Sequence, residues 1–547
     1  MSMPVISALD FTGESMVDET ITNDSPMKRF YRNKTVFITG GLGFLGQLFI
    51  EKLLRCRVKE VYVLVRPKKN KSSIERMRET FVGDVFVKLK SIDPNYFERI
   101  KLIEGDTYKA DIGISQQDRK ELIENVEIVL HAAADVRFDR SLQELCFTNV
   151  RGTKAVTMLA EEMKNLIVFA YVSTAYSQFY RDKIDEKFYP PPCDPDEVIR
   201  ISEYFDKHKT NEFELLTDKM IHPWENTYVF TKSLSEEVVR RASHKIPTVV
   251  TRPSIVMSTY EEPIPGWANN VYGINGITIG SGYGFIKVVP SGPNSRTNVI
   301  CADIVVNGTL AAIWSKANEK RSPSLQNSDE SSTIYHITAQ NALTNAYFAG
   351  EVKKLFYENP SIQCLWLPSL TFADSQLSFL IMVILYHAIP GIAFDIFFKL
   401  INNPQRLLPM YRKSQDFLNR TAYFSNHTWN FGYKNIKAVI DSMCEEDQRF
   451  FNCNVFKFDW IEYSYTYILG MKTYVAKDPP NTETAAKRRF LFLRIIYYPV
   501  LAFYYSCLGC IIYLVMHLTG VTSLLKILCH KFVLTISFFV TFLSKLL

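Results

Sequence analysis

A tyrosine and a lysine four positions apart form the pair in this 547-residue chain whose types and spacing point most directly to chemistry. On a helix, Tyr228 and Lys232 would share one face, because side chains at i and i+4 are neighbours. A nearby ammonium group lowers the pKa of a phenol, so Tyr228 would serve as a proton donor near neutral pH. Such a pair is often only structural, and it predicts proton transfer only together with supporting residues.

Supporting residues occur upstream of this pair. An apolar stretch ends in Ser173 and Thr174, whose hydroxyls can hold a carbonyl oxygen beside Tyr228. Asn149 lies in a stretch with helical character, and its amide can hold Lys232 through a water molecule. We therefore predict a catalytic group that consists of Tyr228, Lys232, Thr174, Ser173 and Asn149.

A glycine-rich turn near the N-terminus predicts a dinucleotide site. Residues 39–46 contain the spacing G-x-G-x-x-G between an apolar, strand-like run and a stretch with helical spacing. Glycines allow a tight turn and a close approach to a pyrophosphate, while N–H groups of the following helix bind phosphate. A turn without a ligand is the alternative, but the flanking strand and helix favour dinucleotide binding. The predicted contacts are Gly40, Gly43, Phe44, Leu45 and Gly46.

The end of the second expected strand indicates which dinucleotide binds. Arg66 stands about twenty residues beyond the glycine turn, where an NAD-binding protein usually carries an acid for the ribose hydroxyls. A cation at this position accommodates a 2′-phosphate, so NADPH is the predicted cofactor. The alternative is that Arg66 and Lys68 only keep the end of a strand in contact with water.

The wider chain predicts an α/β fold around these residues. Short apolar runs that resemble buried strands alternate with helical stretches, which is typical of a parallel sheet covered by helices on both faces. The expected fold is a Rossmann-type doubly wound parallel sheet with a helical C-terminal domain and a C-terminal transmembrane anchor. The strand candidates are residues 35–38, 61–65, 101–103, 127–130, 168–172 and 248–251.

The composition describes a folded protein without a nucleic-acid partner. Charged residues make up 22% and hydrophobic residues 47% of the chain, and the net charge of +6 forms no basic stripe with interleaved aromatic residues. Ten cysteines form no dense framework, the one close pair (Cys507 and Cys510) is interpreted as packing, and no cleavable signal peptide opens the chain, so a reducing compartment is expected. We expect no metal site, and we interpret Cys146 and Cys301 as structural because neither has a local activating base.

The C-terminal region predicts attachment to a membrane. Ile495 to Met516 contains no Asp, Glu, Lys or Arg, and about twenty apolar residues suffice to cross a bilayer as a helix. Basic residues between 487 and 494 precede this stretch and favour a cytosolic location for the preceding domains. A second apolar segment, 532–544, is short for a span and would be re-entrant, interfacial or the return arm of a hairpin.

A further apolar run, Leu377 to Phe394, is interrupted by Pro390 and Gly391. We interpret it as a buried or membrane-dipping helix that shelters an acyl chain, with a plain core helix as the alternative. The chain ends in residues 544–547, Ser-Lys-Leu-Leu, which resemble but do not match the terminal S-K-L peroxisomal signal. The endoplasmic reticulum membrane is therefore the expected location, with the peroxisomal membrane as second choice.

The motifs together resemble the extended short-chain dehydrogenase/reductases. The resemblance rests on the glycine turn and the Tyr–Lys pair, and also on Gly105-Asp106, the run from His131 to Ala134, and Ser173-Thr174. It implies that Asp106 and Ala133 lie along the adenosine half of the cofactor. The alternatives are that His131 is a strand-end histidine satisfied by hydrogen bonds and that Asp106 only forms a turn.

The same resemblance assigns roles to the catalytic residues. It implies that Thr174 orients the carbonyl, that Tyr228 is the general acid, and that Lys232 tunes both the cofactor and the tyrosine. Both Tyr228 and Lys232 would also contact the cofactor.

A narrower resemblance extends over nearly the whole chain, and it is to the fatty acyl-CoA reductases of animals. It implies an NADPH-dependent reduction of long-chain fatty acyl-CoA to a fatty alcohol, with CoA released and the aldehyde kept in the same site. It also implies that a male-sterility-type domain follows the reductase domain. The matching segments are 136–139, 189–195, 252–256, 266–267, 272–273, 276–277, 335–338, 428–431 and 459–460, together with Tyr463.

These observations predict four segments and leave two rival functions open. The rivals are another extended short-chain enzyme, such as a hydroxysteroid dehydrogenase or an epimerase, and a non-enzymatic NADPH-binding membrane scaffold. The former has no reason to carry the region around Trp429 and Trp460, and the latter has no need of an intact Tyr–Lys pair. The predicted segments are a flexible tail (1–33), a reductase domain (34–371), a helical domain (372–478) and an anchor region (479–547).

Overall fold

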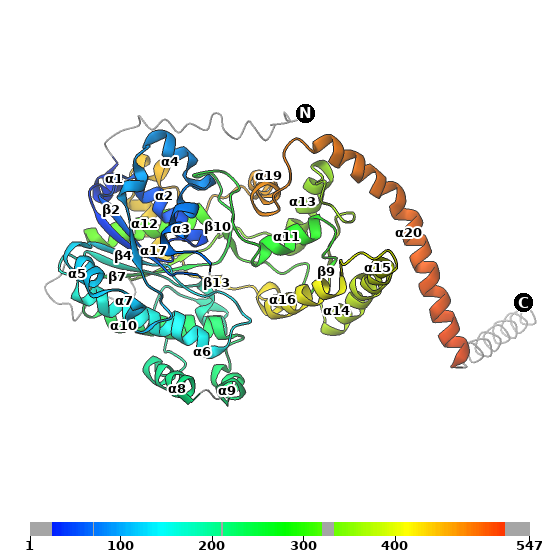
Figure 1. Ribbon diagram of the computed structural model, residues 1–547, viewed down its shortest axis with the longest axis horizontal. Coiled ribbons are helices and arrows are strands. Elements are labelled where there is room, and N and C mark those ends of the chain that lie inside the picture. The colour runs from blue at the N-terminus through cyan, green and yellow to red at the C-terminus, as the bar shows by residue number, and fades with distance from the viewer. Residues whose placement is uncertain (1–24, 69, 209–211, 320–332, 520–547) are drawn as a thin grey trace, which may run out of the picture. The chain divides into compact units, whose positions relative to one another are not determined.

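A seven-stranded parallel sheet forms the centre of the computed structural model, which describes residues 25–68, 70–208, 212–319 and 333–519 (Figure 1). The strand order is β11-β7-β5-β4-β1-β2-β3, and each neighbouring pair is parallel. The chain therefore winds outward in two directions from β1, and the crevice at β1 and β4 is where such sheets bind ligands. The strands are β1 (Thr35–Thr39), β2 (Glu60–Val65), β3 (Ile100–Glu104), β4 (Ile128–His131), β5 (Val168–Val172), β7 (Thr248–Pro253) and β11 (Ile334–Ile337).

Helices cover both faces of this sheet, which explains why its central strands are almost continuously apolar. On one face α2 (Phe44–Arg55) packs against α12 (Ala302–Asn318), and on the other α7 (Gly152–Glu162) packs against α10 (Thr227–Ser243). All five residues of β1 and of β5 are buried. The predicted doubly wound α/β fold is confirmed.

Shorter elements surround the sheet. Further helices are α3 (Ser73–Phe81), α4 (Val87–Ile92), α5 (Gln116–Asn125), α6 (Leu142–Leu145), α8 (Pro195–His208), α9 (Glu212–Ile221), α11 (Ile274–Gly282) and α13 (Asn345–Glu358). Three small parallel pairs join β6 (Lys183–Ile184) with β13 (Asn430–Phe431), β8 (Ile255–Met257) with β10 (Val299–Cys301), and β9 (Val288–Val289) with β12 (Thr371–Phe372).

The N-terminal region is ordered earlier than the predicted tail of residues 1–33 would allow. Pro26–Tyr31 forms α1, and the Tyr31 hydroxyl donates to the carbonyl of Leu310 at 2.7 Å. The carboxylate of Asp447 accepts a hydrogen bond from the Met27 amide at 3.2 Å. A helix of 6 residues is too short to show an apolar period, and its partners lie hundreds of positions away, so its sequence alone did not reveal it.

The C-terminal helices up to Pro480 belong to the same compact unit as the sheet, which comprises residues 1–359 and 368–480. The domain boundary that the sequence predicted between residues 371 and 372 stays a prediction. These helices are α14 (Gln376–Val383), α15 (Ile389–Leu400), α16 (Leu408–Asn426), α17 (Lys434–Ser442), α18 (Glu445–Phe450) and α19 (Trp460–Gly470). A π-helical turn, Ile384–Ala388, joins α14 to α15.

A second unit contains residues 360–367 and 481–547. Its main element is α20 (Glu483–Leu518), a helix of 36 residues whose most apolar stretch is not buried. Within this unit, Arg489 Nε donates to the carbonyl of Cys364 at 3.0 Å. The predicted span of residues 495–516 lies inside α20, which is long and apolar enough to cross a membrane. The second apolar segment, 532–544, and the terminal residues 544–547 lie outside the described part of the chain.

Candidate active site

Helix α10 carries the predicted tyrosine and lysine at its N-terminal end, close to the carboxyl end of β5. The helix begins after Asn226, whose side chain accepts a hydrogen bond from the Val229 amide at 3.1 Å. This cap fixes the first turn, on which Tyr228 is located. Thr174 follows β5, and its side chain is close enough to the phenol of Tyr228 to influence the pKa of that phenol. The structure thus brings Tyr228 and Thr174 together, and the catalytic roles expected for them stay predictions.

Lys232 lies one turn further along α10 and is almost completely buried. Its ammonium donates to the carbonyl oxygen of Val172 at 2.7 Å and to the hydroxyl of Tyr171 at 3.1 Å. Burial lowers the pKa of Lys232 to about 7, and the carboxylate of Glu236 on the next turn acts in the opposite direction. A lysine tuned in this way can change its charge near neutral pH, which is typical of a catalytic site.

Burial also sets the state of the proposed proton donor. The pKa of Tyr228 is raised above its ordinary value mainly by burial, and the Thr174 side chain opposes this shift. The expected lowering of this pKa by Lys232 is wrong, because burial dominates and the ammonium is directed to Val172 and Tyr171. The phenol is therefore protonated at neutral pH. A protonated phenol beside a hydroxyl can donate to an oxygen that gains negative charge.

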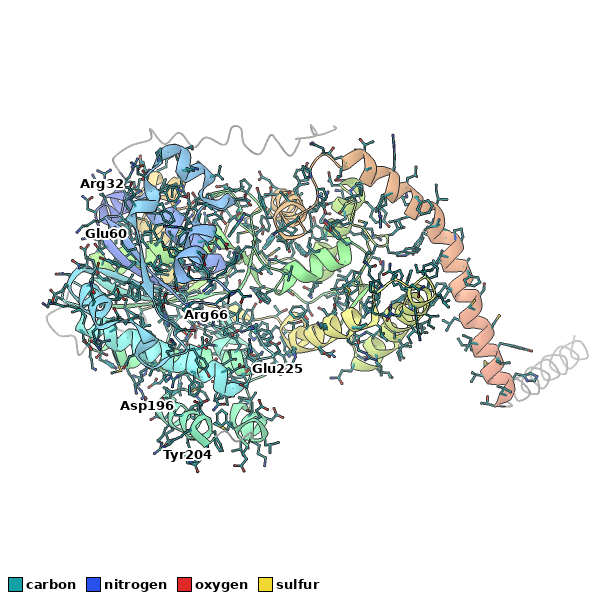
Figure 2. The ribbon with its side chains drawn as sticks, viewed as in Figure 1. Arg32, Glu60, Arg66, Asp196, Tyr204 and Glu225 are labelled. Carbon is teal, nitrogen blue, oxygen red and sulfur yellow. The ribbon has the colours of Figure 1, made fainter. Side chains whose placement is uncertain are left out.

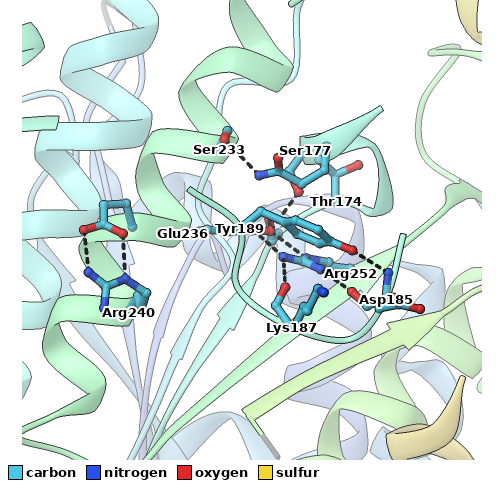
Figure 3. Close-up of polar contacts among 12 residues, drawn as sticks. Thr174, Ser177, Asp185, Lys187, Tyr189, Ser233, Glu236, Arg240 and Arg252 are labelled. Atoms are coloured by element: carbon cyan, nitrogen blue, oxygen red, sulfur yellow. Dashed lines mark hydrogen bonds and ion pairs between the residues drawn. The ribbon is translucent and has the colours of Figure 1, made fainter. Parts of the chain in front are cut away.

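Ser173 is the neighbour of Thr174, but the structure directs its hydroxyl elsewhere. Ser173 Oγ donates to Oε1 of Glu236 at 2.5 Å, and Ser177 Oγ donates to the same oxygen at 3.0 Å. Glu236 also accepts from Nε and Nη2 of Arg252, at 2.9 and 2.7 Å. Figure 3 shows the Glu236 carboxylate between Ser177 and the Arg252 guanidinium. Ser173 is thus held in a buried ion-pair network rather than at Tyr228.

Asn149 lies in a π-helical segment, Cys146–Arg151, and is buried. Its side-chain oxygen accepts from the Asp135 amide at 2.9 Å, and its side-chain nitrogen donates to the Asp135 carbonyl at 3.2 Å. The same nitrogen donates to the Thr231 hydroxyl at 3.1 Å. Asn149 therefore ties the loop after β4 to α10 beside Lys232, and its predicted contact with Lys232 through water stays a prediction.

His131, at the end of β4, is fully satisfied by two threonines. Its Nδ1 lies 2.6 Å from Thr39 Oγ1, and its Nε2 lies 2.9 Å from Thr153 Oγ1. Burial lowers its pKa to about 3, so the ring is neutral. This geometry agrees with the alternative given above, in which His131 is a histidine at a strand end whose ring nitrogens are both hydrogen-bonded.

The glycine turn leaves no room for side chains. Gly40 has a φ of +77°, and a Cβ atom there would lie 2.7 Å from the Ala133 nitrogen. A Cβ atom at Gly46 would lie 2.2 Å from the carbonyl oxygen of Gly40. Helix α2 begins at Phe44 after Gly43, and within the described residues no side chain caps its first amides. These N–H groups are therefore available to an anionic ligand.

A cleft of about 470 Å³ opens at this turn and is lined by the end of β2 and by the loops that follow β1, β3 and β4. Arg66, labelled in Figure 2, has a side chain that is 54% exposed, and its Nη1 lies 3.7 Å from Oδ2 of Asp106. Arg76 also lines the cleft and donates to the backbone oxygen of Arg66. Asp106 itself accepts from the Tyr108 amide at 3.0 Å, so it forms a turn as well as facing the cleft. The lining includes Gly40, Gly43, Arg66, Lys68, Arg76, Asp106, Ala133 and Tyr272.

Two residues of this site were missed by sequence reasoning. Glu236 could have been found, because it stands four positions after Lys232 and shares its helix face. Arg76 could not, because it approaches Arg66 only through the packing of α3. The two cysteines considered as nucleophiles, Cys146 and Cys301, are buried, and burial raises the pKa of both thiols. A raised pKa opposes formation of the thiolate that a nucleophile needs.

The sheet, the glycine turn and the Tyr228–Lys232 pair define an oxidoreductase of the Rossmann type that uses a nicotinamide cofactor. Solved structures support the fold: the reductase domain of a nonribosomal peptide synthetase from Mycobacterium tuberculosis has a TM-score of 0.52 at 16% identity. That comparison covers 81% of this chain and 92% of the other. The terminal R domain of the myxalamid pathway gives a TM-score of 0.51 at 15% identity, with 82% and 92% covered.

Relatives by sequence narrow this class to one family. Residues 38–309 and 386–478 match two family descriptions, both given as male sterility protein. The chain is 33% identical to fatty acyl-CoA reductase wat of Drosophila melanogaster over 500 residues, covering 91% of this chain and 95% of the relative. It is 34% identical to fatty acyl-CoA reductase 2 of Mus musculus over 478 residues, covering 87% and 91%. The chain belongs to the fatty acyl-CoA reductase family.

Proposed function

We propose that this protein reduces long-chain fatty acyl-CoA to a fatty alcohol with NADPH, releasing CoA and keeping the intermediate aldehyde bound. The observation that carries the proposal is the placement of Tyr228, at the start of α10, beside Thr174 just after the end of β5, with the buried ammonium of Lys232 one helical turn away. Family membership supplies the acyl-CoA substrate class. Thioester and aldehyde are both carbonyl compounds, so one arrangement of proton donor and hydroxyl serves both reductions.

The residues of the cleft fit the cofactor. Gly40, Gly43 and Gly46 allow the pyrophosphate to approach the uncapped amides of α2, including those of Phe44 and Leu45. The 2′-phosphate would be held by the cations of the cleft, and the adenosine half would lie along Asp106 and Ala133. When bound, the cofactor supplies the hydride. The cations concerned are Arg66, Lys68 and Arg76.

The chain's own residues handle the oxygen and the proton. Thr174 and Tyr228 hold the carbonyl oxygen, and Tyr228 transfers its phenolic proton as negative charge develops there. The positive charge of Lys232 stabilises the phenolate that remains. In the first reduction a tetrahedral hemithioacetal forms; the phenolate of Tyr228 then takes back the hydroxyl proton as the C–S bond breaks, and CoA leaves as a thiolate. The aldehyde then takes a second hydride and a second proton from Tyr228.

The rival functions lack a supporting observation. Another extended short-chain enzyme would share α10 and the glycine turn, but the match to residues 386–478 favours a fatty acyl-CoA reductase. A non-enzymatic scaffold would not need the tuned pKa of Lys232. These observations favour the proposed reaction over both rival functions.

We also propose that the protein is anchored in the endoplasmic reticulum membrane with its catalytic part in the cytosol, the peroxisomal membrane being second choice. The support is α20, whose apolar stretch contains residues 495–516, together with the basic residues 487–494 before it. Alkaline carbonate extraction tests the anchor. The full chain should stay in the membrane pellet, whereas a chain ending near residue 487 should be released; retention of the shortened chain would contradict α20 as the anchor.

A product assay tests the function directly. Membranes containing the full chain are incubated with a panel of acyl-CoAs and NADPH, and the lipids are identified by mass spectrometry. The matching fatty alcohol is expected from long-chain substrates, and the Tyr228→Phe protein is the matched control. Accumulation of aldehyde alone would overturn the two-step reduction, and the absence of any reduced lipid would overturn the proposed function.

A further inference from the structure

The helix formed by α14, the π turn and α15 exposes an unusually apolar surface. It is long and apolar enough to cross a membrane, yet 22% of its most apolar stretch is buried. Soluble proteins rarely expose contiguous apolar patches of this kind unless they bind a partner or a membrane. The exposed side chains are Leu377, Leu380, Ile381, Ile384, Ile389, Ile392, Phe394, Ile396, Phe397 and Leu400.

One narrow stripe of this helix is attached to the protein. Phe379, Val383, His387 and Gly391 recur every four residues and are buried. His387 Nε2 accepts a hydrogen bond from the Lys287 amide at 3.0 Å, and its ring stacks on another aromatic ring with centroids 4.8 Å apart. The attachment therefore runs from α14 through the π turn into α15.

The ring stacked on His387 belongs to Tyr411 of α16, and α16 is a polar helix. A Cβ atom at Gly391 would lie 3.1 Å from Cδ2 of Tyr411, so the two helices are in close contact. Asp395 accepts a hydrogen bond from the amide of Leu407, at 2.6 Å, just before α16 begins. Figure 1 shows α14, α15 and α16 grouped together. A span made by α14 and α15 would draw this polar partner into hydrocarbon, which is costly.

Basic residues in the last turn of α15, in the loop after it and in the first turns of α16 would complement an anionic surface. Lys399, Arg406, Arg412 and Lys413 are all exposed. The stretch 395–416 contains two acids, Asp395, which is engaged in the hydrogen bond described above, and Asp416. An exposed apolar helix face with basic residues beside it is typical of helices that lie in a membrane interface.

We infer that residues 376–401 lie in the plane of a lipid surface, with the exposed apolar face immersed among acyl chains and the basic residues at anionic headgroups. The helix neither crosses the bilayer nor belongs to a closed core. Its immersed face is the one opposite the stripe that contacts α16.

Helix α16 links this lipid-facing surface to the catalytic tyrosine. Near its C-terminus, Phe424 packs against Phe138 with ring centroids 6.1 Å apart, and Phe138 packs against Tyr228 at 5.8 Å. Arg420 donates to the Phe138 carbonyl at 3.2 Å. Packed side chains of α16 thus join the proposed lipid contact to Tyr228, a link that matters for an acyl substrate. This last consequence rests on the proposed function, whereas the membrane contact itself does not.

Depth-dependent fluorescence quenching tests the inference on the full chain. An environment-sensitive fluorescent amino acid is placed singly at positions 380, 392 and 397, and the proteins are reconstituted into vesicles of phosphatidylcholine and phosphatidylserine. The control carries the probe at the exposed polar position Asn419 of α16. Lipids brominated near the headgroup, or near the chain end, quench the probe according to its depth.

The inference predicts that headgroup-brominated lipids quench positions 380, 392 and 397 severalfold and to a similar extent, with position 419 unaffected. Strong quenching by chain-end bromines at position 392 alone would indicate a span and overturn the inference. Insensitivity of all three positions to both lipids would overturn it as well, and would indicate contact with a second copy of the chain. Each comparison uses one variant in two lipids, and retained nicotinamide nucleotide binding shows that the variant is folded.

The basic residues provide a second test. Replacing Arg406 and Lys413 by glutamine should reduce headgroup quenching at position 397 in vesicles with phosphatidylserine, and should change it little in pure phosphatidylcholine. An equal change in both vesicle types would contradict a role for these charges.

Discussion

The charged side chains at the two ends of the site differ in their exposure to solvent. At the cofactor end, the side chain of Arg66 is 54% exposed and its Nη1 lies 3.7 Å from Oδ2 of Asp106, so its charge is open to solvent and to a ligand in the cleft. At the catalytic end, Lys232 is 3% exposed, Glu236 2% and Arg252 0%, and each has defined partners. Removing an exposed cation should therefore weaken only the binding of the cofactor. Removing a buried group should cost chemistry or the fold itself, because its partner is left unsatisfied.

The largest effect is expected from Glu236→Gln. This change leaves the fully buried guanidinium of Arg252 without its ion-pair partner, which should destabilise the protein by about 3–5 kcal/mol. The matched control is Asp441→Asn, which breaks the exposed pair with Lys437 and should cost less than about 1 kcal/mol. Thermal unfolding in detergent measures both. Equal losses for the two variants would mean that burial does not distinguish the two pairs.

The next effect concerns the proton donor. Tyr228→Phe keeps the ring and removes the phenolic proton, so turnover should fall by roughly two orders of magnitude, or about 2.7 kcal/mol of transition-state stabilisation. NADPH binding and unfolding temperature should stay close to those of the unaltered protein. A correctly folded variant with near-normal turnover would show that another group supplies the proton.

At the cofactor end, Arg66→Ala should weaken NADPH binding by about 1–3 kcal/mol, because a charge-assisted contact to the 2′-phosphate is lost. NADH binding should change little. Arg57→Ala is a suitable control, since its side chain is 56% exposed and pairs with Asp93 away from the cleft. Binding titrations with both nucleotides measure the difference, and an equal loss for the two would contradict the assignment of Arg66.

The last effect is a pH dependence of stability. Burial holds the pKa of Lys232 at about 7 in the folded protein, below its ordinary value of 10.5. Between these values the unfolded chain binds more protons, so this residue's contribution to stability rises with pH and is lost as pH falls through about 7. Without cofactor, the unaltered protein should gain stability relative to Lys232→Met between about pH 7 and pH 9. A constant difference over this interval would place the folded pKa above it, near the ordinary value.

The same contrast explains what the sequence could reveal. The glycine turn and the Tyr228–Lys232 pair depend on spacings of a few residues and were predictable. Ser173 was grouped with Thr174 because the two are adjacent, but adjacent residues at a strand end point in different directions, and Ser173 binds Glu236. The pairing of Glu236 with Arg252 and of α1 with Asp447 arises from packing between distant segments. No local pattern could have predicted these contacts.

The apolar run from Leu377 to Phe394 shows a second limit. Its composition fits a core helix, a span or a membrane-dipping helix equally well, because all three are rich in Leu, Ile and Phe. The decisive information is which residues face the protein, and the buried stripe from Phe379 to Gly391 supplies it. Sequence periodicity is weak here because the exposed face is as apolar as the buried one.

The central claim is that one buried Tyr228–Lys232 centre performs two successive reductions. The most direct test measures, in the same reaction, the NADPH oxidised and the free CoA thiol released by membranes that contain the full chain and a long-chain acyl-CoA. The account predicts about two NADPH for each CoA, since thioester and aldehyde each take one hydride. A ratio of about one, with aldehyde in solution, would contradict it, because the second reduction would then not occur in this site.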